Sequence, residues 1–428
     1  MEHFRVEGGH RLSGSVKVSG AKNSALKLMA ASLLTRGRTV LINVPRIADV
    51  FTMGEVLEYL GADVEFESDC LSIDTSVREI RTHAPYELVR RMRASINVLG
   101  PLIARYGHGR VAMPGGCNIG SRPIQIHQQA LQRLGVEFHV DHGDLEGHAS
   151  ELTGTKVVLD FPTRGATENL LTAGALARGT TVIENAAREP DIIDLAEFLN
   201  KMGAKVSGAG TPTITIEGVS ELRPAAYKVP SDPIEAGSLA LMVLASYGEA
   251  ELVGARARDL ELFLTKLSDT GARWKSTENG IEVTATHRPV AVDFATLPFP
   301  GFPTDLQPQM VAYLAAAEGT SIVTENIFES RFMHVNELTR MGADIRIEGQ
   351  HAVIRGVPRL AGAPVRASDL RAGAALVIAA LGAEGITTIH DVHHIDRGYE
   401  NLEQKLLRLG AQLERVTEEL SFDTSFLS

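Results

Sequence analysis

A glycine-rich stretch from Pro114 to Pro123, Pro-Gly-Gly-Cys-Asn-Ile-Gly-Ser-Arg-Pro, combines residue types that could do chemistry. Its three glycines reach backbone conformations that other residues avoid, which predicts a loop that can close on a ligand. The loop carries one thiol, Cys117, and one guanidinium, Arg122. A free cysteine is usually a small buried hydrophobe, but burial fits poorly with a loop that ends in Arg-Pro. Cys117 is therefore a candidate for thiol chemistry, with burial as the alternative.

The composition narrows the classes of protein to consider. The chain has 428 residues, 44% of them hydrophobic and 22% charged, which predicts a globular protein of at least two domains. Cys70 is the only other cysteine, so a disulfide framework and a cysteine-rich zinc site are excluded. A formal net charge of -11 argues against a general nucleic-acid surface. The longest uncharged apolar run, Ala372 to Ala383, is too short to cross a bilayer, and Met1 to Phe4 opens no signal peptide, so we expect a cytoplasmic protein without membrane partners.

The elements that must position this loop belong to an internal repeat. A short signature of an apolar residue or threonine, then Gly, then Ala or Val recurs six times at intervals of 68 to 74 residues, with its glycine at Gly61, Gly135, Gly203, Gly271, Gly342 and Gly410. Each glycine follows an amphipathic pattern and precedes a β-branched or alternating segment, which predicts a helix, a glycine C-cap and a strand. A second glycine lies upstream in every copy, where we expect it to separate another helix from a strand: Gly37, Gly109, Gly179, Gly248, Gly319 and Gly385.

A proline-punctuated stretch from Leu222 to Pro233 divides three copies from three. We therefore predict two domains of equal build, 21–230 and 231–428 plus 1–20. The segment from Phe4 to Gly9 precedes the first complete copy, and the last copy lacks a final strand. We expect the N-terminal segment to supply it.

Unusual polar residues gather at two positions of the repeat. The first is the start of the upstream helix, where free amides attract anions, and the second is the loop after the first strand, where we place Asp49. If both domains turn these ends to one cleft, six cations surround one space: Lys22, Arg93, Arg122, Arg331, Arg371 and Arg397. Six cations in a net-acidic chain predict a ligand with several phosphate or carboxylate groups.

Each of these residues also has a purely structural interpretation. A single Arg or Asp at a helix start is more often a cap or a surface ion pair, although six at equivalent positions are harder to explain in that way. No Walker or dinucleotide glycine motif is present, and we predict no cofactor and no metal. The histidines without metal-ligand spacing are interpreted as structural or supporting residues: His127, His334, His393 and His394.

Seven motifs together resemble the UDP-N-acetylglucosamine 1-carboxyvinyltransferases, a family of enolpyruvyl transferases. They are Ser19 to Asn23, Met92 to Ser95, Pro114 to Pro123, Asn185 to Pro190, Phe302 to Asp305, Glu325 to Glu329 and His394 to Tyr399. The resemblance spans nearly the whole chain, and the cysteine loop combined with Asp-Arg-Gly-Tyr is highly specific. It implies an α/β fold, a two-domain inside-out α/β barrel built from six βαβαββ repeats, with the active site in the cleft between the domains.

The resemblance also implies a reaction, the first committed step of peptidoglycan synthesis and thus a part of cell-wall biogenesis, cell shape and cell division. The enolpyruvyl group of phosphoenolpyruvate moves to the 3-hydroxyl of UDP-N-acetylglucosamine, and phosphate leaves. By resemblance, Cys117 is the general acid at C3, with adduct formation and help in product release left open, and Asp305 is the base for the sugar hydroxyl.

The remaining roles follow from the same resemblance. Lys22, Arg122 and Arg397 are expected to hold phosphate, Arg331 and Arg371 carboxylate, and Asn23 the sugar. Arg93 and Asp49 are expected to support catalysis. The nucleotide contacts are expected from Arg122, Pro123 and Ile126 around uracil, from Thr163, Arg164 and Gly165 at the diphosphate, and from Ile327 and Phe328 on the nucleotide side. Ile124 and Gln125 are expected as further substrate contacts.

The sequence departs from common family patterns on the acceptor side, at Arg164, Pro233, Gln125 and Phe299. We hypothesise that Arg164 adds a diphosphate contact in place of an arginine that is frequent at position 233. Two alternatives remain open. One is an enolpyruvyl transferase with another nucleotide acceptor, and the other is a non-catalytic UDP-sugar sensor, which would be expected to have lost Cys117, Asp305 or the arginines.

Overall fold

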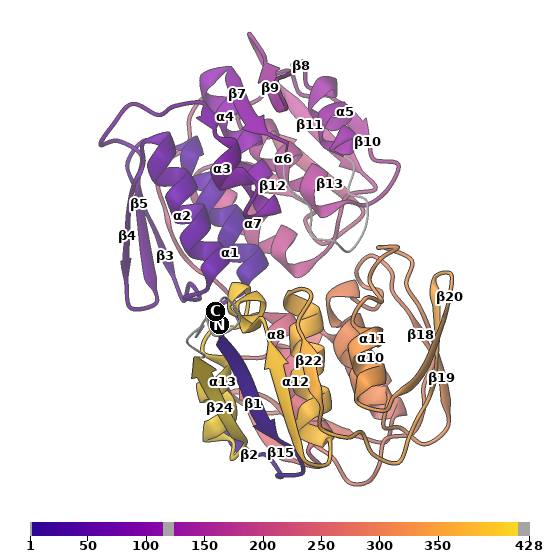
Figure 1. Cartoon of the computed structure of the whole chain (residues 1–428). Helices are drawn as coiled ribbons and strands as arrows, with labels where there is room; N and C mark the ends of the chain where they lie inside the picture. The colour runs from indigo at the N-terminus through magenta and orange to yellow at the C-terminus, as the bar shows by residue number, and fades with distance from the viewer. Residues whose placement is uncertain (1, 114–123, 418–428) are drawn as a thin grey trace, which may run out of the picture. The chain divides into compact units, whose positions relative to one another are not determined.

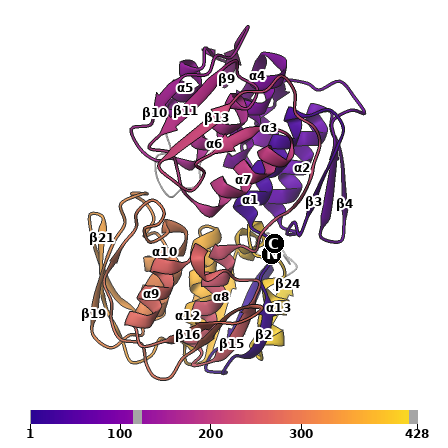
Figure 2. The ribbon, with the colours of Figure 1, turned by 180° about the vertical axis from the view of Figure 1, so that it is seen from behind.

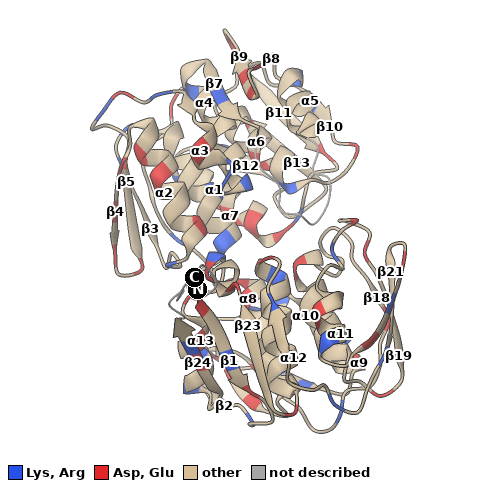
Figure 3. Cartoon of the chain, in the orientation of Figure 1, with Lys and Arg blue, Asp and Glu red and all other residues tan. Residues whose placement is uncertain are grey.

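Six four-stranded sheets are present in the part of the chain that the computed structural model describes, residues 2–113 and 124–417. They belong to two structural units (Figure 1). Unit 1 comprises Met1–Val18, Pro233–Leu297 and Phe302–Ser428, and unit 2 comprises Ser19–Asp232 and Pro298–Gly301. Figure 3 shows acidic and basic residues interspersed along the elements of each unit.

Unit 2 contains three repeats. In chain order its elements are α1 (Lys22–Ala31), the 3-10 helix η1 (Ser32–Leu34), β3 (Arg38–Ile42), α2 (Ala48–Leu60), β4 (Asp63–Glu67), β5 (Cys70–Asp74), β6 (His83–Ala84), α3 (Tyr86–Val89), η2 (Arg93–Val98), α4 (Leu99–Tyr106), β7 (His108–Ala112), α5 (Gln125–Arg133), β8 (Glu137–Asp141), β9 (Asp144–His148), β10 (Lys156–Val158), α6 (Arg164–Gly174), β11 (Thr180–Glu184), α7 (Pro190–Lys201), β12 (Lys205–Ser207), β13 (Thr213–Glu217) and β14 (Ala226–Lys228). Its sheets have the strand orders β14-β3-β5-β4, β6-β7-β9-β8 and β10-β11-β13-β12.

Unit 1 contains the other three repeats. Its elements are β1 (Glu2–Glu7), β2 (Ser13–Lys17), α8 (Pro233–Ala245), β15 (Glu249–Val253), η3 (Ala257–Asp259), α9 (Glu261–Asp269), β16 (Arg273–Ser276), β17 (Gly280–Thr284), β18 (Phe294–Ala295), η4 (Thr304–Leu306), α10 (Gln307–Leu314), β19 (Thr320–Thr324), α11 (Val335–Arg340), β20 (Asp344–Glu348), β21 (His351–Arg355), β22 (Pro364–Arg366), α12 (Leu370–Gly382), β23 (Ile386–His390), η5 (Val392–Arg397), α13 (Leu402–Arg408) and β24 (Gln412–Thr417). Its sheets have the strand orders β16-β17-β15-β2, β18-β19-β21-β20 and β22-β23-β1-β24.

One sheet illustrates the pairing pattern of the repeats. The short β10 pairs in parallel with β11, with Val157 opposite Ile183, and β11 and β12 both pair antiparallel with β13. The parallel pair requires a crossover, which α6 provides. Figure 2 shows β10, β11 and β13 beside α6 from behind. The other sheets likewise contact helices of their own unit.

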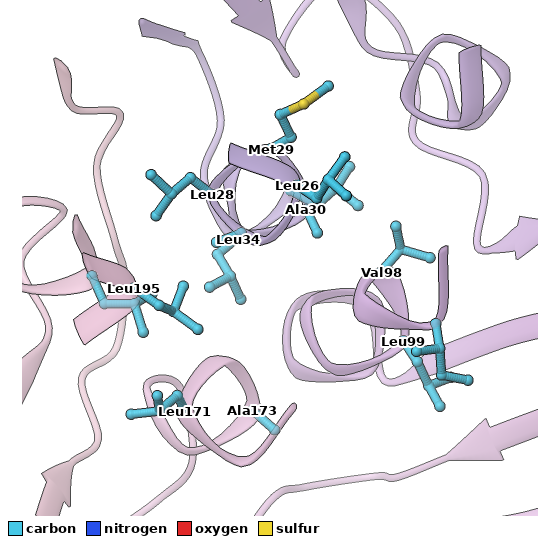
Figure 4. Close-up of a cluster of buried hydrophobic side chains, with 14 of the residues drawn as sticks. Leu26, Leu28, Met29, Ala30, Leu34, Val98, Leu99, Leu171, Ala173 and Leu195 are labelled. Carbon is cyan, nitrogen blue, oxygen red and sulfur yellow. The ribbon is translucent and has the colours of Figure 1, made fainter. Parts of the chain in front are cut away.

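The inner helices explain why the barrel is inside out. All of α12 except Gly382 is buried, and so is all of α8 except its first and last residues, because both helices are apolar around their circumference. Together with α10 they form the centre of unit 1. In unit 2 the equivalent core combines side chains of α1, η1, η2, α4, α6 and α7, including Leu26, Met29, Leu99 and Leu171 (Figure 4). The predicted fold class is confirmed.

The chain exchanges strands between repeats in a way that the sequence did not indicate. β14 precedes α8 in the chain but completes the first sheet of unit 2, pairing in parallel with β3. β2 precedes α1 but pairs in parallel with β15 of unit 1. The predicted role of the N-terminal segment is confirmed, because β1 lies between β23 and β24 and is antiparallel to both.

The predicted glycine helix ends are confirmed in all six copies, where the signature glycine has φ between 87° and 113°. One prediction for the upstream glycine was wrong. Gly109 lies inside β7, and Gly107, with φ 70°, ends α4 instead. In the fourth copy Gly248 does separate α8 from β15, and the left-handed residue there is Tyr247, with φ 57°, directly before it.

Candidate active site

In unit 1 one carboxylate is shared by two guanidinium groups. Arg331 Nη2 donates to Asp305 Oδ1 at 3.0 Å, and Arg371 Nη2 donates to Asp305 Oδ2 at 3.2 Å. The Arg331 and Arg371 side chains are 2% and 7% exposed, and that of Asp305 is 20% exposed. These three side chains together carry a net charge of +1, which suits an anionic ligand.

The Asp305 turn is held by a carboxylate that our sequence reasoning did not single out. Glu325 is buried and accepts hydrogen bonds from the Thr296 and Thr304 hydroxyls at 2.8 and 3.0 Å. It also accepts from the backbone amides of Ile327 and Phe328 at 2.8 and 3.1 Å. One side chain therefore fixes both the residue before Asp305 and the predicted nucleotide-side residues. The sequence does mark Glu325, because it begins the motif from Glu325 to Glu329, but we used this motif only for the family resemblance.

The two arginines are fixed through their backbones. Asp369 caps α12, with Oδ1 accepting from Arg371 N at 2.9 Å and Ala372 N at 3.1 Å. The Arg331 carbonyl oxygen accepts from His334 Nδ1 at 3.1 Å, which sets the tautomer of this buried ring. Burial lowers the pKa of His334 to about 4, so the imidazole is neutral near pH 7.

The other predicted residues of unit 1 lie close to this group in sequence or space. Phe328 places its ring centroid 5.9 Å from the Arg331 guanidinium carbon, and Ile327 precedes it, half-buried. Arg397 ends η5 and is half-buried. Burial, then the neighbouring charges of His393 and Arg397, lower the pKa of His394 below its ordinary value.

In unit 2 Lys22, the first of the predicted cations along the chain, already has a carboxylate partner. Lys22 begins α1, and its Nζ lies 2.6 Å from Asp49 Oδ2; the Lys22 side chain is 11% exposed and that of Asp49 is buried. Its backbone amide donates to Asp232 Oδ2 at 3.0 Å, and Asn23 follows in the same turn. Asp49 was predicted in a loop, but it lies in the first turn of α2, where its charge favours the positive end of the helix.

The predicted diphosphate residues stand at the beginning of α6. Thr163 is the N-cap residue, and Arg164 and Gly165 open the helix, whose free amides favour an anion. Arg164 Nε lies 3.3 Å from Glu189 Oε1, and the Arg164 side chain is 30% exposed. A side chain at Gly165 would meet His127, because an added Cβ would lie 2.4 Å from the ring.

The buried His127 carries a defined tautomer. Asn169 Nδ2 donates to His127 Nδ1 at 2.9 Å, so the ring holds its proton on Nε2. Burial, and then the positive charge of Arg93, lower the pKa of His127 to about 4.

The predicted nucleotide contacts at the start of α5 differ in exposure. Ile124 is buried, Ile126 is half-buried and Gln125 is exposed.

A buried ion cluster in unit 2 was missed by our sequence reasoning. Lys27 Nζ, on α1, contacts Glu168 Oε1 of α6 at 2.6 Å and also contacts Asp191 Oδ2 of α7. All three side chains are buried. Burial by itself lowers the pKa of Lys27, but attraction to Asp191 and then Glu168 raises it above its ordinary value. The signal was a lysine inside an apolar helix.

Three predicted residues, Cys117, Arg122 and Pro123, lie outside the described residues. Within residues 2–113 and 124–417 no helix is long and apolar enough to cross a membrane. In the same part of the chain, no group of three or more His, Cys, Asp or Glu side chains is arranged to hold a metal ion.

Comparison with known proteins identifies the family. The family model of EPSP synthase (3-phosphoshikimate 1-carboxyvinyltransferase) matches residues 6–406. The chain belongs to this family of enolpyruvyl transferases. The predicted family relationship is thereby confirmed.

Curated relatives of the chain carry a more specific name. The chain is 52% identical over 415 residues to UDP-N-acetylglucosamine 1-carboxyvinyltransferase of Corynebacterium jeikeium, covering 97% of this chain and 99% of the relative. It is 51% identical over 415 residues to the protein of that name from Mycobacterium tuberculosis, with the same coverage. The relative from Thermodesulfovibrio yellowstonii is 49% identical over 417 residues, covering 97% and 100%.

Solved structures agree with the fold. The enolpyruvyl transferase NikO from Streptomyces tendae superposes with a TM-score of 0.88 at 27% identity, covering 98% of this chain and 99% of NikO. EPSP synthase from Acinetobacter baumannii gives a TM-score of 0.75 at 18% identity, covering 97% of this chain and 100% of that one. The second likeness shows the fold alone.

Proposed function

We propose that the chain transfers the enolpyruvyl group of phosphoenolpyruvate to the 3-hydroxyl of UDP-N-acetylglucosamine and releases phosphate. The observation that carries the proposal is the group formed by Asp305, Arg331 and Arg371, in a chain about half identical to relatives of that name. A base held beside two cations is what an acceptor hydroxyl and an anionic donor require together. In a bacterial cell this reaction would serve peptidoglycan synthesis, and through it cell shape and division.

In the proposed reaction Asp305 takes the proton of the sugar 3-hydroxyl as its oxygen bonds to C2 of phosphoenolpyruvate. A proton is added at C3, for which Cys117 is the proposed donor. C3 then loses a proton, the C2–C3 double bond forms again, and the bond from C2 to the phosphate oxygen breaks. The proposed phosphate-holding residues are Lys22, Arg122 and Arg397.

The Arg331 and Arg371 guanidinium groups are proposed to hold the substrate carboxylate. They already bind one carboxylate, that of Asp305, at 3.0 and 3.2 Å. The arriving substrate would then share or replace these contacts, and Asp305 would gain freedom to accept a proton. That the active site lies between the predicted domains stays a prediction.

On the acceptor side we propose that Arg164 contributes a diphosphate contact. The support is its place at the start of α6, where backbone amides favour an anion, and a side chain that remains 30% exposed beside Glu189. Gly165 would offer its backbone amide, whereas the Thr163 amide donates to the Phe161 carbonyl oxygen at 2.7 Å and would have to exchange that bond. Asn23, Ile124, Gln125, Ile126, Ile327 and Phe328 are proposed as further acceptor contacts, and Arg93 and Asp49 as supporting residues.

The test is phosphate release from phosphoenolpyruvate with and without UDP-N-acetylglucosamine, for the wild type and Cys117→Ser. We expect release that requires the UDP-sugar and falls sharply in the variant. Release with UMP or shikimate 3-phosphate in place of the UDP-sugar would assign a different acceptor. Absence of release with every acceptor, together with tight UDP-sugar binding, would indicate a sensor.

A further inference from the structure

A buried group of uncharged polar side chains lies behind Arg371 in unit 1. Arg371 Nη1 is 3.4 Å from the Tyr399 hydroxyl, which is 2.8 Å from Ser238 Oγ. Gln309 Nε2 donates to both oxygens, at 3.1 Å to Tyr399 and 3.2 Å to Ser238. Tyr399 is 1% exposed, and Ser238 and Gln309 are 0% exposed. Tyr399 lies in the turn after η5, Ser238 on α8 and Gln309 on α10, so the group joins three repeats.

One order of donors satisfies the hydrogen bonds of this group. A guanidinium has no acceptor, so Arg371 donates and the Tyr399 oxygen accepts. The Tyr399 proton is then available to Ser238, whose own hydroxyl donates to the Ile234 carbonyl oxygen at 2.8 Å. Burial raises the pKa of Tyr399 above its ordinary value, so the hydroxyl keeps the proton that this order requires.

This order connects the backbone of α8 to the proposed carboxylate-binding group. The chain of donors starts at Arg371, passes Tyr399 and Ser238, and ends on the α8 carbonyl of Ile234. The other arm of the Arg371 guanidinium, Nη2, donates to Asp305. The Tyr399 ring also stacks near the guanidinium carbon, 5.7 Å from its centroid. One end of the guanidinium is thus held by Tyr399 while the other faces the site.

We propose that Tyr399, supported by Ser238, is a positioning residue that aims Arg371 at the carboxylate of the donor substrate. The inference rests on the proposed function and deepens it, because it adds a residue that acts through Arg371. Removing the hydroxyl would take away the acceptor that Tyr399 offers to Arg371 Nη1, and the side chain would shift towards its other contacts. The guanidinium group of Arg371 would then lose its orientation but keep its charge.

The simpler alternative is that the Tyr399 hydroxyl only fills and satisfies the core. Unit 1 offers a matched control in Tyr313, which is 4% exposed, lies on α10 and hydrogen-bonds Thr270 through its side chain. Burial raises the pKa of Tyr313 to about 12, so both hydroxyls are buried and protonated. Tyr313→Phe removes an equivalent buried hydroxyl that does not serve Arg371.

The experiment compares Tyr399→Phe and Tyr313→Phe in steady-state kinetics of phosphate release. For Tyr399→Phe we expect KM for phosphoenolpyruvate to rise about tenfold or more, on the scale of one buried hydrogen bond to a charged group. We expect kcat and KM for UDP-N-acetylglucosamine to stay within about twofold, since the acceptor contacts are elsewhere. Tyr313→Phe should leave all three within about twofold. Equal KM values for phosphoenolpyruvate in the two variants would overturn the proposal.

Two further variants keep the test decisive if Tyr399→Phe does not fold. Ser238→Ala removes the acceptor of the Tyr399 proton and should raise the same KM by a smaller factor, about two- to threefold, whereas Ser238→Thr keeps a hydroxyl and should restore it. If Tyr399→Phe folds, a double-mutant test is added: in an Arg371→Lys background, Tyr399→Phe should cause no additional rise in KM for phosphoenolpyruvate. A full additional rise would mean that Tyr399 acts by another route.

Calorimetric binding of phosphoenolpyruvate to the same proteins separates this inference from the proposed function. A wild type that releases no phosphate with any acceptor would overturn the function. Weaker binding by Tyr399→Phe than by Tyr313→Phe would still support the positioning role, and equal binding would overturn it.

Discussion

The two units solve the same electrostatic problem in different ways. In unit 1 two guanidinium groups share the single carboxylate of Asp305, and one of them rests on neutral hydroxyl and amide groups. In unit 2 three cations of the predicted site and the core are matched with carboxylates: Lys22 with Asp49, Arg164 with Glu189, and Lys27 with Glu168 and Asp191. The Asp305 group of unit 1 therefore has a net positive charge, whereas these three groups of unit 2 are neutral or negative, although unit 1 also contains a matched pair in Lys405 and Glu235.

The largest effect should come from removing the shared carboxylate of unit 1. Asp305→Asn should lower kcat about 10²- to 10⁴-fold, the scale of a lost general base. Binding of phosphoenolpyruvate should be unchanged or tighter by calorimetry, because both guanidinium groups lose an internal competitor. Asp344→Asn, which alters an exposed carboxylate of the same unit, is the control. Weakened phosphoenolpyruvate binding in Asp305→Asn would contradict the charge-excess description of unit 1.

In unit 2 the comparison predicts a loss of stability rather than of binding. Lys27→Met would leave Glu168 and Asp191 buried without their cation, which should cost about 3 kcal/mol or more in the free energy of unfolding. Urea denaturation measures it. Lys156→Met is the matched control, since its pair with Glu184 is 60% and 39% exposed and contributes at most about 1 kcal/mol. Similar losses in both variants would show that the buried cluster is not a special support of unit 2.

Acid should weaken both units through one buried imidazole each, His127 in unit 2 and His334 in unit 1. Their pKa values are about 4 in the folded chain against 6.5 for a free side chain, so the unfolded chain binds more protons between these pH values. The contribution of each neutral ring to the free energy of unfolding is fully present above pH 6.5 and is lost as the pH falls towards 4. The loss is up to about 3 kcal/mol for each ring, at ~1.4 kcal/mol per pKa unit.

Unfolding measured between pH 7 and 4 tests this expectation. His127→Gln and His334→Gln should each remove about half of the imidazole-dependent slope, because each removes one of two similar shifts. A slope unchanged in both variants would assign the acid sensitivity to carboxylates instead.

The smallest effect is expected at the diphosphate side of unit 2. Arg164→Ala should raise KM for UDP-N-acetylglucosamine about three- to tenfold and leave KM for phosphoenolpyruvate unchanged, since one exposed charge-assisted contact is lost. Arg178→Ala, at an exposed arginine paired with Glu151, is the control. An unchanged KM for the UDP-sugar in Arg164→Ala would mean that Arg164 only neutralises Glu189.

Much of the fold was predictable because its signals are local. A glycine after an amphipathic helix is a C-cap wherever it occurs, so six copies of the signature predicted six helix ends and two domains of three repeats. The family followed from motifs, which are also local. The exchange of β2 and β14 between repeats was not predictable, because a short strand pairs with whichever sheet edge the chain reaches.

The geometry of the site depended on contacts between distant residues. The sequence by itself determined that Asp305, Arg331 and Arg371 stand at equivalent ends of repeats. Only the tertiary structure decided that Asp305 lies between arginines 26 and 66 residues away, and that Tyr399 reaches Ser238 across 161 residues. The same holds for Lys27 and its carboxylates. A residue's type records the charge it carries, but packing alone decides which partner satisfies that charge once water is excluded.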